Sequence, residues 1–128
     1  MKPLGYWLVH IHDLMETGFA QLLETDGLTR RHWQVLNTIA AKPGDMGEIQ
    51  QALAHFQDDV RPLIGDFVDR GWVKGEYELT TTGRAAYDRI AARVHSERAK
   101  VLTGISAEEY ATLMNLLERI AANAAAPV

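Results

Sequence analysis

The sequence predicts a mainly α-helical protein: a winged helix-turn-helix with a three-helix core, a short β-hairpin wing, and N- and C-terminal dimerisation helices. Apolar residues recur at steps of three and four along most of the chain, which is the spacing of amphipathic helices. The one credible hairpin has Trp72-Val73-Lys74 and Tyr77-Glu78-Leu79 on either side of Gly75-Glu76. Because this hairpin follows three short helices, the order of elements is that of a helix-turn-helix with a wing.

The composition of the chain is that of an ordinary globular protein. Its 128 residues include 13 basic and 17 acidic side chains, for a formal net charge of −4, and no cysteine. The lack of cysteine excludes disulfides, thiolate zinc sites and iron–sulfur clusters. No segment has the roughly 18 consecutive apolar residues of a membrane span, and the first residues do not read as a signal peptide. We expect one cytoplasmic domain over residues 1–128, without a membrane partner.

The first two helices are expected over residues 3–23 and about 29–41. Pro3 suits the first turn of the first helix, where its missing N–H has no partner to lose. Its apolar side consists of Leu4, Trp7, Leu8, Ile11, Met15, Phe19 and Leu22. The second helix turns Trp33, Leu36, Ile39 and Ala40 inward and stops at Lys42-Pro43-Gly44.

The next two helices are short. Asp45 and Glu48 predict a capping box at the start of the third, whose buried side is Ile49, Ala52 and Leu53. In the fourth helix, Asp59 is the expected cap. Pro62 then lies at the third helical position, where no helix hydrogen bond is lost. Its predicted apolar side is Val60, Leu63, Ile64, Phe67 and Val68, and Gly71 ends it.

The hairpin and two further helices complete the chain. Gly75 takes the first position of a two-residue turn, and Thr80 caps a long helix that ends at Gly104. Ser106 and Glu109 form a capping box for the last helix. The helices over 3–23 and 81–125 are too long to bury their apolar stripes on the 28–80 core. A second copy of the chain is the natural partner, so we expect a homodimer.

Four motifs, taken in order, resemble the MarR family of winged-helix transcriptional regulators over nearly the whole chain. They are Leu28-Thr29 through Trp33-Gln34-Val35-Leu36, Val60 through Val73, Leu79-Thr80-Thr81-Thr82-Gly83-Arg84, and Leu102 through Glu109. The resemblance implies a dimer that places two recognition helices in successive major grooves of duplex DNA. Carried over by position, the DNA-contacting candidates are Gln57, Asp58, Asp59, Arg61, Pro62, Gly65, Asp66, Lys74 and Arg84.

The local charge departs from what DNA binding favours. Six acidic residues lie between positions 56 and 84, namely Asp58, Asp59, Asp66, Asp69, Glu76 and Glu78. Four basic ones oppose them, Arg61, Arg70, Lys74 and Arg84, which gives a local balance of −2. Most affinity for DNA comes from cations that displace counterions at phosphates. The alternative is therefore a winged-helix dimer that has lost DNA binding and acts as a ligand-sensing or protein-interaction module.

Other features are weaker signals. Tyr6, Trp7, His10, Trp33 and Tyr87 are either core residues or the lining of a cleft that, in the resembling family, takes small aromatic effectors. The basic stretch Arg84, Arg89, Arg93, Arg98 and Lys100 is either a solvated face or a support for the DNA backbone. His10 and His12 point in different directions on a helix, so no metal site is expected. No catalytic motif or nucleotide fingerprint is present, and we expect neither an enzyme nor a cofactor.

Overall fold

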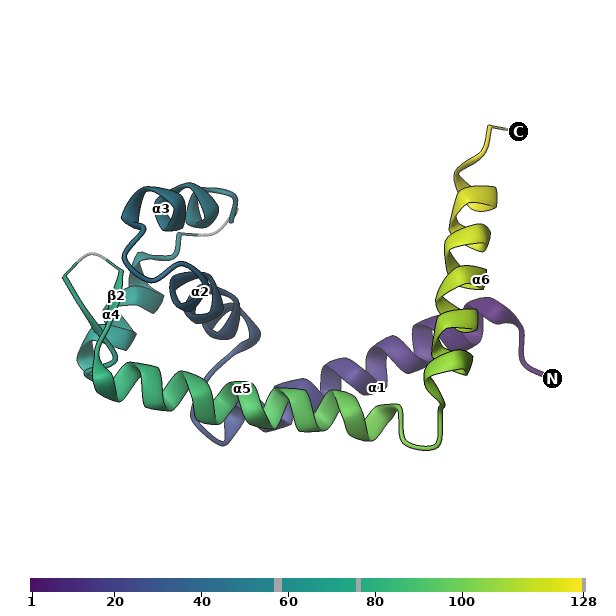
Figure 1. Ribbon diagram of the computed structural model, residues 1–128, viewed down its shortest axis with the longest axis horizontal. Helices are drawn as coiled ribbons and strands as arrows, with labels where there is room; N and C mark the ends of the chain where they lie inside the picture. Colours follow the sequence, from purple (N-terminus) through teal and green to yellow (C-terminus); the bar gives the residue numbers. More distant parts are fainter. Residues whose placement is uncertain (57–58, 76, 128) are drawn as a thin grey trace. The chain divides into compact units, whose positions relative to one another are not determined.

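The computed structural model describes residues 1–56, 59–75 and 77–127 (Figure 1). The chain divides into two compact units, Met1–Glu97 and Arg98–Val128. The described elements are α1 Leu4–Glu24, α2 Arg30–Ala41, α3 Met46–Ala54, α4 Arg61–Asp69, β1 Val73–Lys74, β2 Glu78–Leu79, α5 Thr81–Val101 and α6 Ala107–Ala125. The predicted element order is confirmed. The prediction of a single domain over the whole chain stays a prediction.

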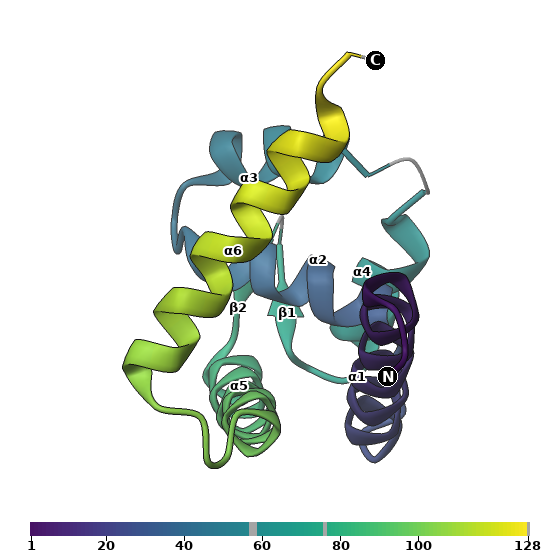
Figure 2. The same cartoon turned by 90° about the vertical axis from the view of Figure 1, so that its right-hand side faces the viewer.

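The hydrophobic core lies in the first unit, around α2. This helix contacts α3, α4 and β2, and Figure 2 shows it at the centre of that group. The four residues predicted to face inward from α2 are all buried, together with Val35. The largest fully buried side chains of the core are Phe67, Leu23, Leu36, Ile39, Ile49, Ile90 and Val35. The three-helix core therefore forms as the apolar spacing predicts.

Two reciprocal caps begin helices, and a third is only half formed. Ser106 Oγ accepts the Glu109 N–H at 3.1 Å while Glu109 returns a carboxylate to the Ser106 N–H at 2.9 Å, as predicted. Thr29 makes the same reciprocal cap at the start of α2 with His32. Asp45 caps α3 by accepting the Glu48 N–H at 3.1 Å. The carboxylate of Glu48, however, lies 3.4 Å from Lys42 Nζ, so the predicted capping box there is wrong in its second half.

A Schellman motif terminates helix α4 after Asp69, and Gly71 is its left-handed residue, as predicted. The Trp72 N–H donates to Phe67 O at 2.9 Å, the Gly71 N–H donates to Val68 O at 2.9 Å, and Gly71 has the positive φ of +76° that this cap requires. The rings of Phe67 and Trp72 stack with centroids 5.9 Å apart. The prediction that Val68 faces inward is wrong, because its side chain is 47% exposed. The cap fixes the direction in which the chain leaves the helix and enters the hairpin.

The pairing of the strands shows that the predicted two-residue turn is wrong. Strand β1 pairs with β2 antiparallel, with Val73 opposite Leu79 and Lys74 opposite Glu78, so Tyr77 does not pair with Lys74 as that turn requires. Gly75 has a φ of +56°, as expected for the first loop position, and Tyr77 has a φ of +64°. Glu76 lies outside the described residues. Tyr77 is also half-buried against the core, which draws it out of the strand pairing.

Thr80 caps α5 and ties its start to the preceding segment. Its Oγ1 accepts the Gly83 N–H at 2.9 Å and donates to Gly71 O at 2.5 Å, and its own N–H donates to Trp72 O at 2.9 Å. Gly83 is buried in the first turn, where a Cβ would lie 2.0 Å from Trp72 O. The first turn of α5 therefore packs directly on the backbone at the start of β1.

Apolar residues are exposed on both terminal helices. Leu23 is the buried residue of α1, and no described residue of α6 is buried. The exposed large apolar residues of α1 are Leu4, Tyr6, Trp7, Leu8, Val9, Ile11, Leu14 and Met15. Those of α6 are Tyr110, Leu113, Leu116 and Ile120. Even so, within the described residues, none of the helices has the length and apolar character to cross a membrane.

Candidate nucleic-acid interface

Helix α4 has one face in the core and one face in solvent. Leu63 and Ile64 pack against the core, and Phe67 is fully buried. The exposed residues of the helix are Arg61, Pro62, Gly65, Val68 and Asp69. In a helix-turn-helix this second helix is the one that enters the major groove, with its N-terminal residues nearest the bases. We call the exposed residues Arg61, Pro62, Gly65, Val68 and Asp69 the reading face.

Asp59 and Arg61 form a side-on ion pair at the start of the reading face. Arg61 Nε donates to Asp59 Oδ1 and Oδ2 at 3.1 and 3.2 Å, and Nη2 donates to Oδ2 at 3.0 Å. The backbone N–H of Arg61 also donates to Asp59 Oδ1 at 3.0 Å. These bonds to the Arg61 side chain and backbone lower the pKa of Asp59, and the carboxylate raises the pKa of Arg61. The N-cap of α4 is Val60 and not the predicted Asp59, so Pro62 lies at the second helical position instead of the third.

Asp66 is paired within the protein. Its Oδ2 lies 3.1 Å from His32 Nε2 and 3.4 Å from Arg70 Nε. His32 Nδ1 accepts the Thr29 N–H at 3.1 Å, so in the neutral ring the proton is on Nε2 and is donated to Asp66. His32 thus joins the cap of α2 to the middle of α4. The sequence interpretation missed this role, because 34 residues separate the two partners.

Arg70 fixes the other end of α4. Its Nη1 donates to Asp26 O at 2.7 Å and its Nη2 to Gly27 O at 3.2 Å, in the turn between α1 and α2. The guanidinium also lies over the Trp72 ring, 5.1 Å from its centroid. Arg70 is therefore a structural residue that holds α4, rather than a free cation for phosphate. Its carbonyl partners could not be identified from side-chain patterns, since every residue carries a carbonyl.

The remaining DNA-binding candidates lie in different environments. Lys74 is exposed on β1, with Nζ 3.9 Å from Glu78 Oε1. Arg84 is half-buried in the first turns of α5, with its guanidinium 5.6 Å from the Tyr87 ring centroid. Gly65 is exposed, and a Cβ there would meet nothing within 4 Å. Gln57 and Asp58 lie outside the described residues. Their assignment to DNA contacts stays a prediction, as it does for the others.

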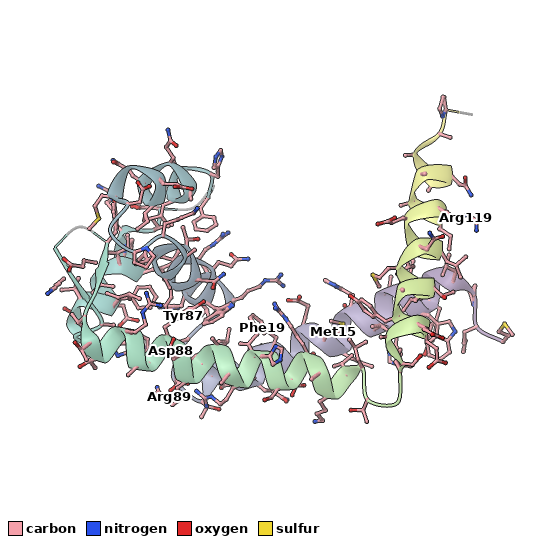
Figure 3. All side chains as sticks on the ribbon, viewed as in Figure 1. Met15, Phe19, Tyr87, Asp88, Arg89 and Arg119 are labelled. Atoms are coloured by element: carbon pink, nitrogen blue, oxygen red, sulfur yellow. The ribbon has the colours of Figure 1, made fainter. Side chains whose placement is uncertain are left out.

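The basic stretch of α5 is partly used inside the protein. Arg89 Nη2 lies 3.2 Å from Asp26 Oδ1, and Arg93 pairs with Asp26 Oδ2. In Figure 3, Arg89 lies beside the turn after α1, whereas Tyr87 points from α5 toward α2. Asp26 therefore joins the α1–α2 turn to α5, which is neither of the two roles weighed for this stretch. Its partners are 63 and 67 residues away in sequence, so no local pattern announces them.

The predicted ligand-pocket residues form two groups. Tyr6, Trp7 and His10 contact one another on α1, with the Tyr6 centroid 5.2 Å from Trp7 and 5.3 Å from His10. Trp33 and Tyr87 pack together at 5.4 Å, and the Tyr87 hydroxyl donates to Asn37 Oδ1 at 2.6 Å. The first group is exposed and Trp33 is buried. A cleft formed by both groups stays a prediction. Across the described ranges, no three His, Asp or Glu side chains are grouped to hold a metal ion.

Comparison with known proteins identifies the fold. No protein-family model matches the sequence. A protein of unknown function from Listeria innocua matches at a TM-score of 0.72 and 17% identity, over 94% of this chain and 91% of that one. A MarR-family protein of Mycobacterium tuberculosis, solved in complex with DNA, matches at a TM-score of 0.70 and 24% identity, over 94% of this chain and 98% of that one.

Two further structures carry the same family name. The reduced form of MarR from E. coli matches at a TM-score of 0.64 and 22% identity, over 94% of each chain. The Mycobacterium tuberculosis protein in complex with salicylic acid matches at a TM-score of 0.63 and 25% identity, over 94% of this chain and 99% of that one. Both matches span nearly the full length of the proteins compared. The chain therefore has the winged-helix fold of the MarR-family transcriptional regulators.

Proposed function

We propose that this protein is a transcriptional regulator of the MarR type, which binds duplex DNA as a homodimer in the cytoplasm. The observation that carries the proposal is the reading face of α4. It is exposed, and the helix behind it is held by His32 near its middle and by Arg70 at its end. A recognition helix must be held in this way to reach base edges reproducibly. A solved protein of the same fold is in complex with DNA.

Several of the acidic side chains counted near α4 form ion pairs within the protein. Asp59 is paired with Arg61, Asp66 with Arg70 and His32, and Glu78 lies near Lys74. These carboxylates are neutralised where they stand, but the same pairs also occupy the cations that would otherwise reach phosphates. The local balance of −2 therefore persists. We expect binding that depends on hydrogen bonds to bases more than on the release of counterions.

The exposed apolar side chains of α1 and α6 support the homodimer. A specific interface buries about 800 Å² on each partner, with an apolar centre. Leu4, Leu8, Ile11 and Met15 follow one another at steps of four and three on α1, and all are exposed. Leu113, Leu116 and Ile120 follow the same spacing on α6. A second copy of the chain would cover both stripes.

A small aromatic effector fits the same proposal. The exposed rings of Tyr6, Trp7 and His10 offer stacking surfaces on α1, and a solved protein of the same fold holds salicylic acid. Salicylate added to the complex with DNA should quench tryptophan fluorescence and release the duplex. If neither signal changes at millimolar concentration, this effector class is wrong.

DNA binding is tested by titrating the protein against a labelled duplex from its own upstream region, at several salt concentrations. Binding should weaken with salt, by about 0.9 in log K per log salt for each phosphate that is neutralised. Arg61→Ala should weaken binding. Arg119→Ala, which removes the same charge from α6, is the matched control and should not.

The same titration addresses the second candidate, a winged-helix dimer that has lost DNA binding and senses ligands or binds proteins. The local excess of negative charge favours it. No binding to any duplex at low salt, from a folded dimer, would contradict the regulator and support this candidate.

A further inference from the structure

We propose that Asp59 and Arg61 act as one base-reading unit, in which the carboxylate holds the guanidinium side-on so that its free edge reads a guanine in the major groove. The inference rests on the proposed function and names the residues that determine its sequence specificity. Asp59, an acidic residue at the start of α4, is then part of the recognition surface.

The geometry of the pair leaves the correct donors free. A guanidinium has five N–H groups in a fixed plane. Asp59 takes the Nε–H and one N–H of Nη2, at 3.0 to 3.2 Å. The other N–H of Nη2 and the two of Nη1 remain, and two of these point the same way along the far edge. Guanine presents O6 and N7 side by side in the major groove, which is the acceptor pattern that this edge fits.

The pair is also ordered before DNA arrives. The Arg61 backbone N–H donates to Asp59 Oδ1 at 3.0 Å, so the carboxylate is fixed to the first turn of α4 and the side chain of Arg61 is fixed to the carboxylate. Arg61 is nevertheless 88% exposed. A long side chain held in place in solvent loses less freedom on binding than a free arginine, which favours recognition.

The charge of the pair decides what kind of contact it makes. Both groups stay ionised at neutral pH, since each shifts the other's pKa toward its charged form. Their net charge is zero, so a contact with a base releases few counterions and adds little to non-specific affinity. It reads sequence through hydrogen bonds instead.

The surroundings of the pair suit close approach to bases. One turn along the reading face, Gly65 has no side chain, and a Cβ there would meet nothing within 4 Å. Pro62 carries no polar side-chain group. Among the described residues of this face, Arg61 is the one with side-chain donors. A base pair can therefore approach the backbone near Gly65 while Arg61 reaches its edge.

The test is a selection of duplexes with a randomised centre by the wild-type dimer and by two variants, followed by titration of the selected duplex. Wild type should enrich a guanine at one fixed position in each half-site. Arg61→Lys keeps the charge but loses the paired donors, and should reduce discrimination at that position about tenfold. Asp59→Asn frees Arg61 for phosphates, so the guanine preference should fall while the salt slope steepens by about 0.9.

The opposite pattern would overturn the inference. If Arg61→Lys weakens all duplexes equally and the guanine preference is absent, Arg61 is a phosphate contact or no contact, and the regulator proposal stands without this unit. If wild type selects no duplex at all, the proposed function fails and the inference fails with it. Thermal unfolding of the exposed variants checks that each result comes from a folded protein.

Discussion

Gly83 shows how one residue determines a junction of this fold. A Cβ at this position would lie 2.0 Å from Trp72 O and 2.7 Å from Trp72 C, which are backbone atoms that cannot move aside like the end of a side chain. Gly83→Ala should therefore lower the free energy of unfolding by about 3 kcal/mol, at the upper end of the cost of overpacking. Urea denaturation followed by circular dichroism measures it.

Gly65→Ala is the matched control for that substitution. Position 65 is also a helical glycine, but a Cβ there meets nothing within 4 Å and its φ is negative. The free energy of unfolding of this variant should rise by about 0.5 to 1 kcal/mol, because alanine loses less backbone freedom on folding than glycine. Equal effects at the two positions would show that helix propensity, rather than contact with Trp72, governs Gly83.

Single residues with local partners could be predicted from the sequence, and those with distant partners could not. The helix caps made by Thr80, Ser106 and Gly71 join residues three positions apart, and each cap was assigned correctly. His32, Arg70 and Asp26 bond across 34 to 67 residues. The sequence shows that these groups are polar but not which of them meet, so the tethers of α4 emerge only from the structure.

At the scale of elements, His32 couples α2 to α4. His32→Ala would remove the two bonds of the imidazole ring, to the Thr29 N–H and to Asp66, but would keep the His32 backbone N–H that Thr29 caps. The free energy of unfolding should therefore fall by about 1 to 2 kcal/mol. His32→Gln should recover part of the loss, because glutamine is a regular partner in a capping box. Denaturant titrations of wild type and the two variants give their order of stability. If the alanine variant is as stable as wild type, the bond to Asp66 contributes nothing.

The start of α6 depends on its cap, since no described residue of this helix is buried. Glu109 accepts the Ser106 backbone N–H, which lowers its pKa below the ordinary 4.5. Because the pKa of Glu109 is lower in the folded protein than in the unfolded chain, the bond stabilises the fold at pH values above the unfolded pKa. This stabilisation is lost as the pH falls through the folded pKa. An NMR titration should show the lowered pKa of Glu109.

Ser106→Pro gives the control for that titration. The φ of Ser106 is −72°, which suits a proline ring, but proline has no N–H to donate. The pKa of Glu109 should return toward 4.5 in this variant. A pKa that stays low would assign the shift to another cause.

The elements themselves were largely predictable, and the exceptions have a common cause. Apolar spacing and caps located the start of each described helix to within a residue or two. The hairpin register and the exposure of Val68 depend instead on contacts with the core, where Tyr77 packs and Val68 does not. A local pattern gives the type of element, but packing decides the last residue of a turn and the edge of a helix face.

At the scale of the whole molecule, the apolar faces of α1 and α6 predict association. Sedimentation equilibrium should give twice the 14.3 kDa of one chain. Leu8→Glu puts a charge on the exposed stripe of α1, and Leu113→Glu does the same on α6. Each variant should shift the equilibrium toward the monomer, because an interface must remove the new carboxylate from water.

DNA binding should fall with dimerisation, since a monomer engages one half-site and loses the gain from holding two at once. In a titration with the selected duplex, Leu8→Glu should therefore weaken binding although α4 is untouched. Thr17→Glu adds the same charge to an exposed polar position of α1 and should leave mass and affinity unchanged. If Leu8→Glu remains a dimer, the α1 stripe is not the interface. If it becomes a monomer that binds DNA as tightly as wild type, each α4 acts alone and the two-site arrangement is wrong.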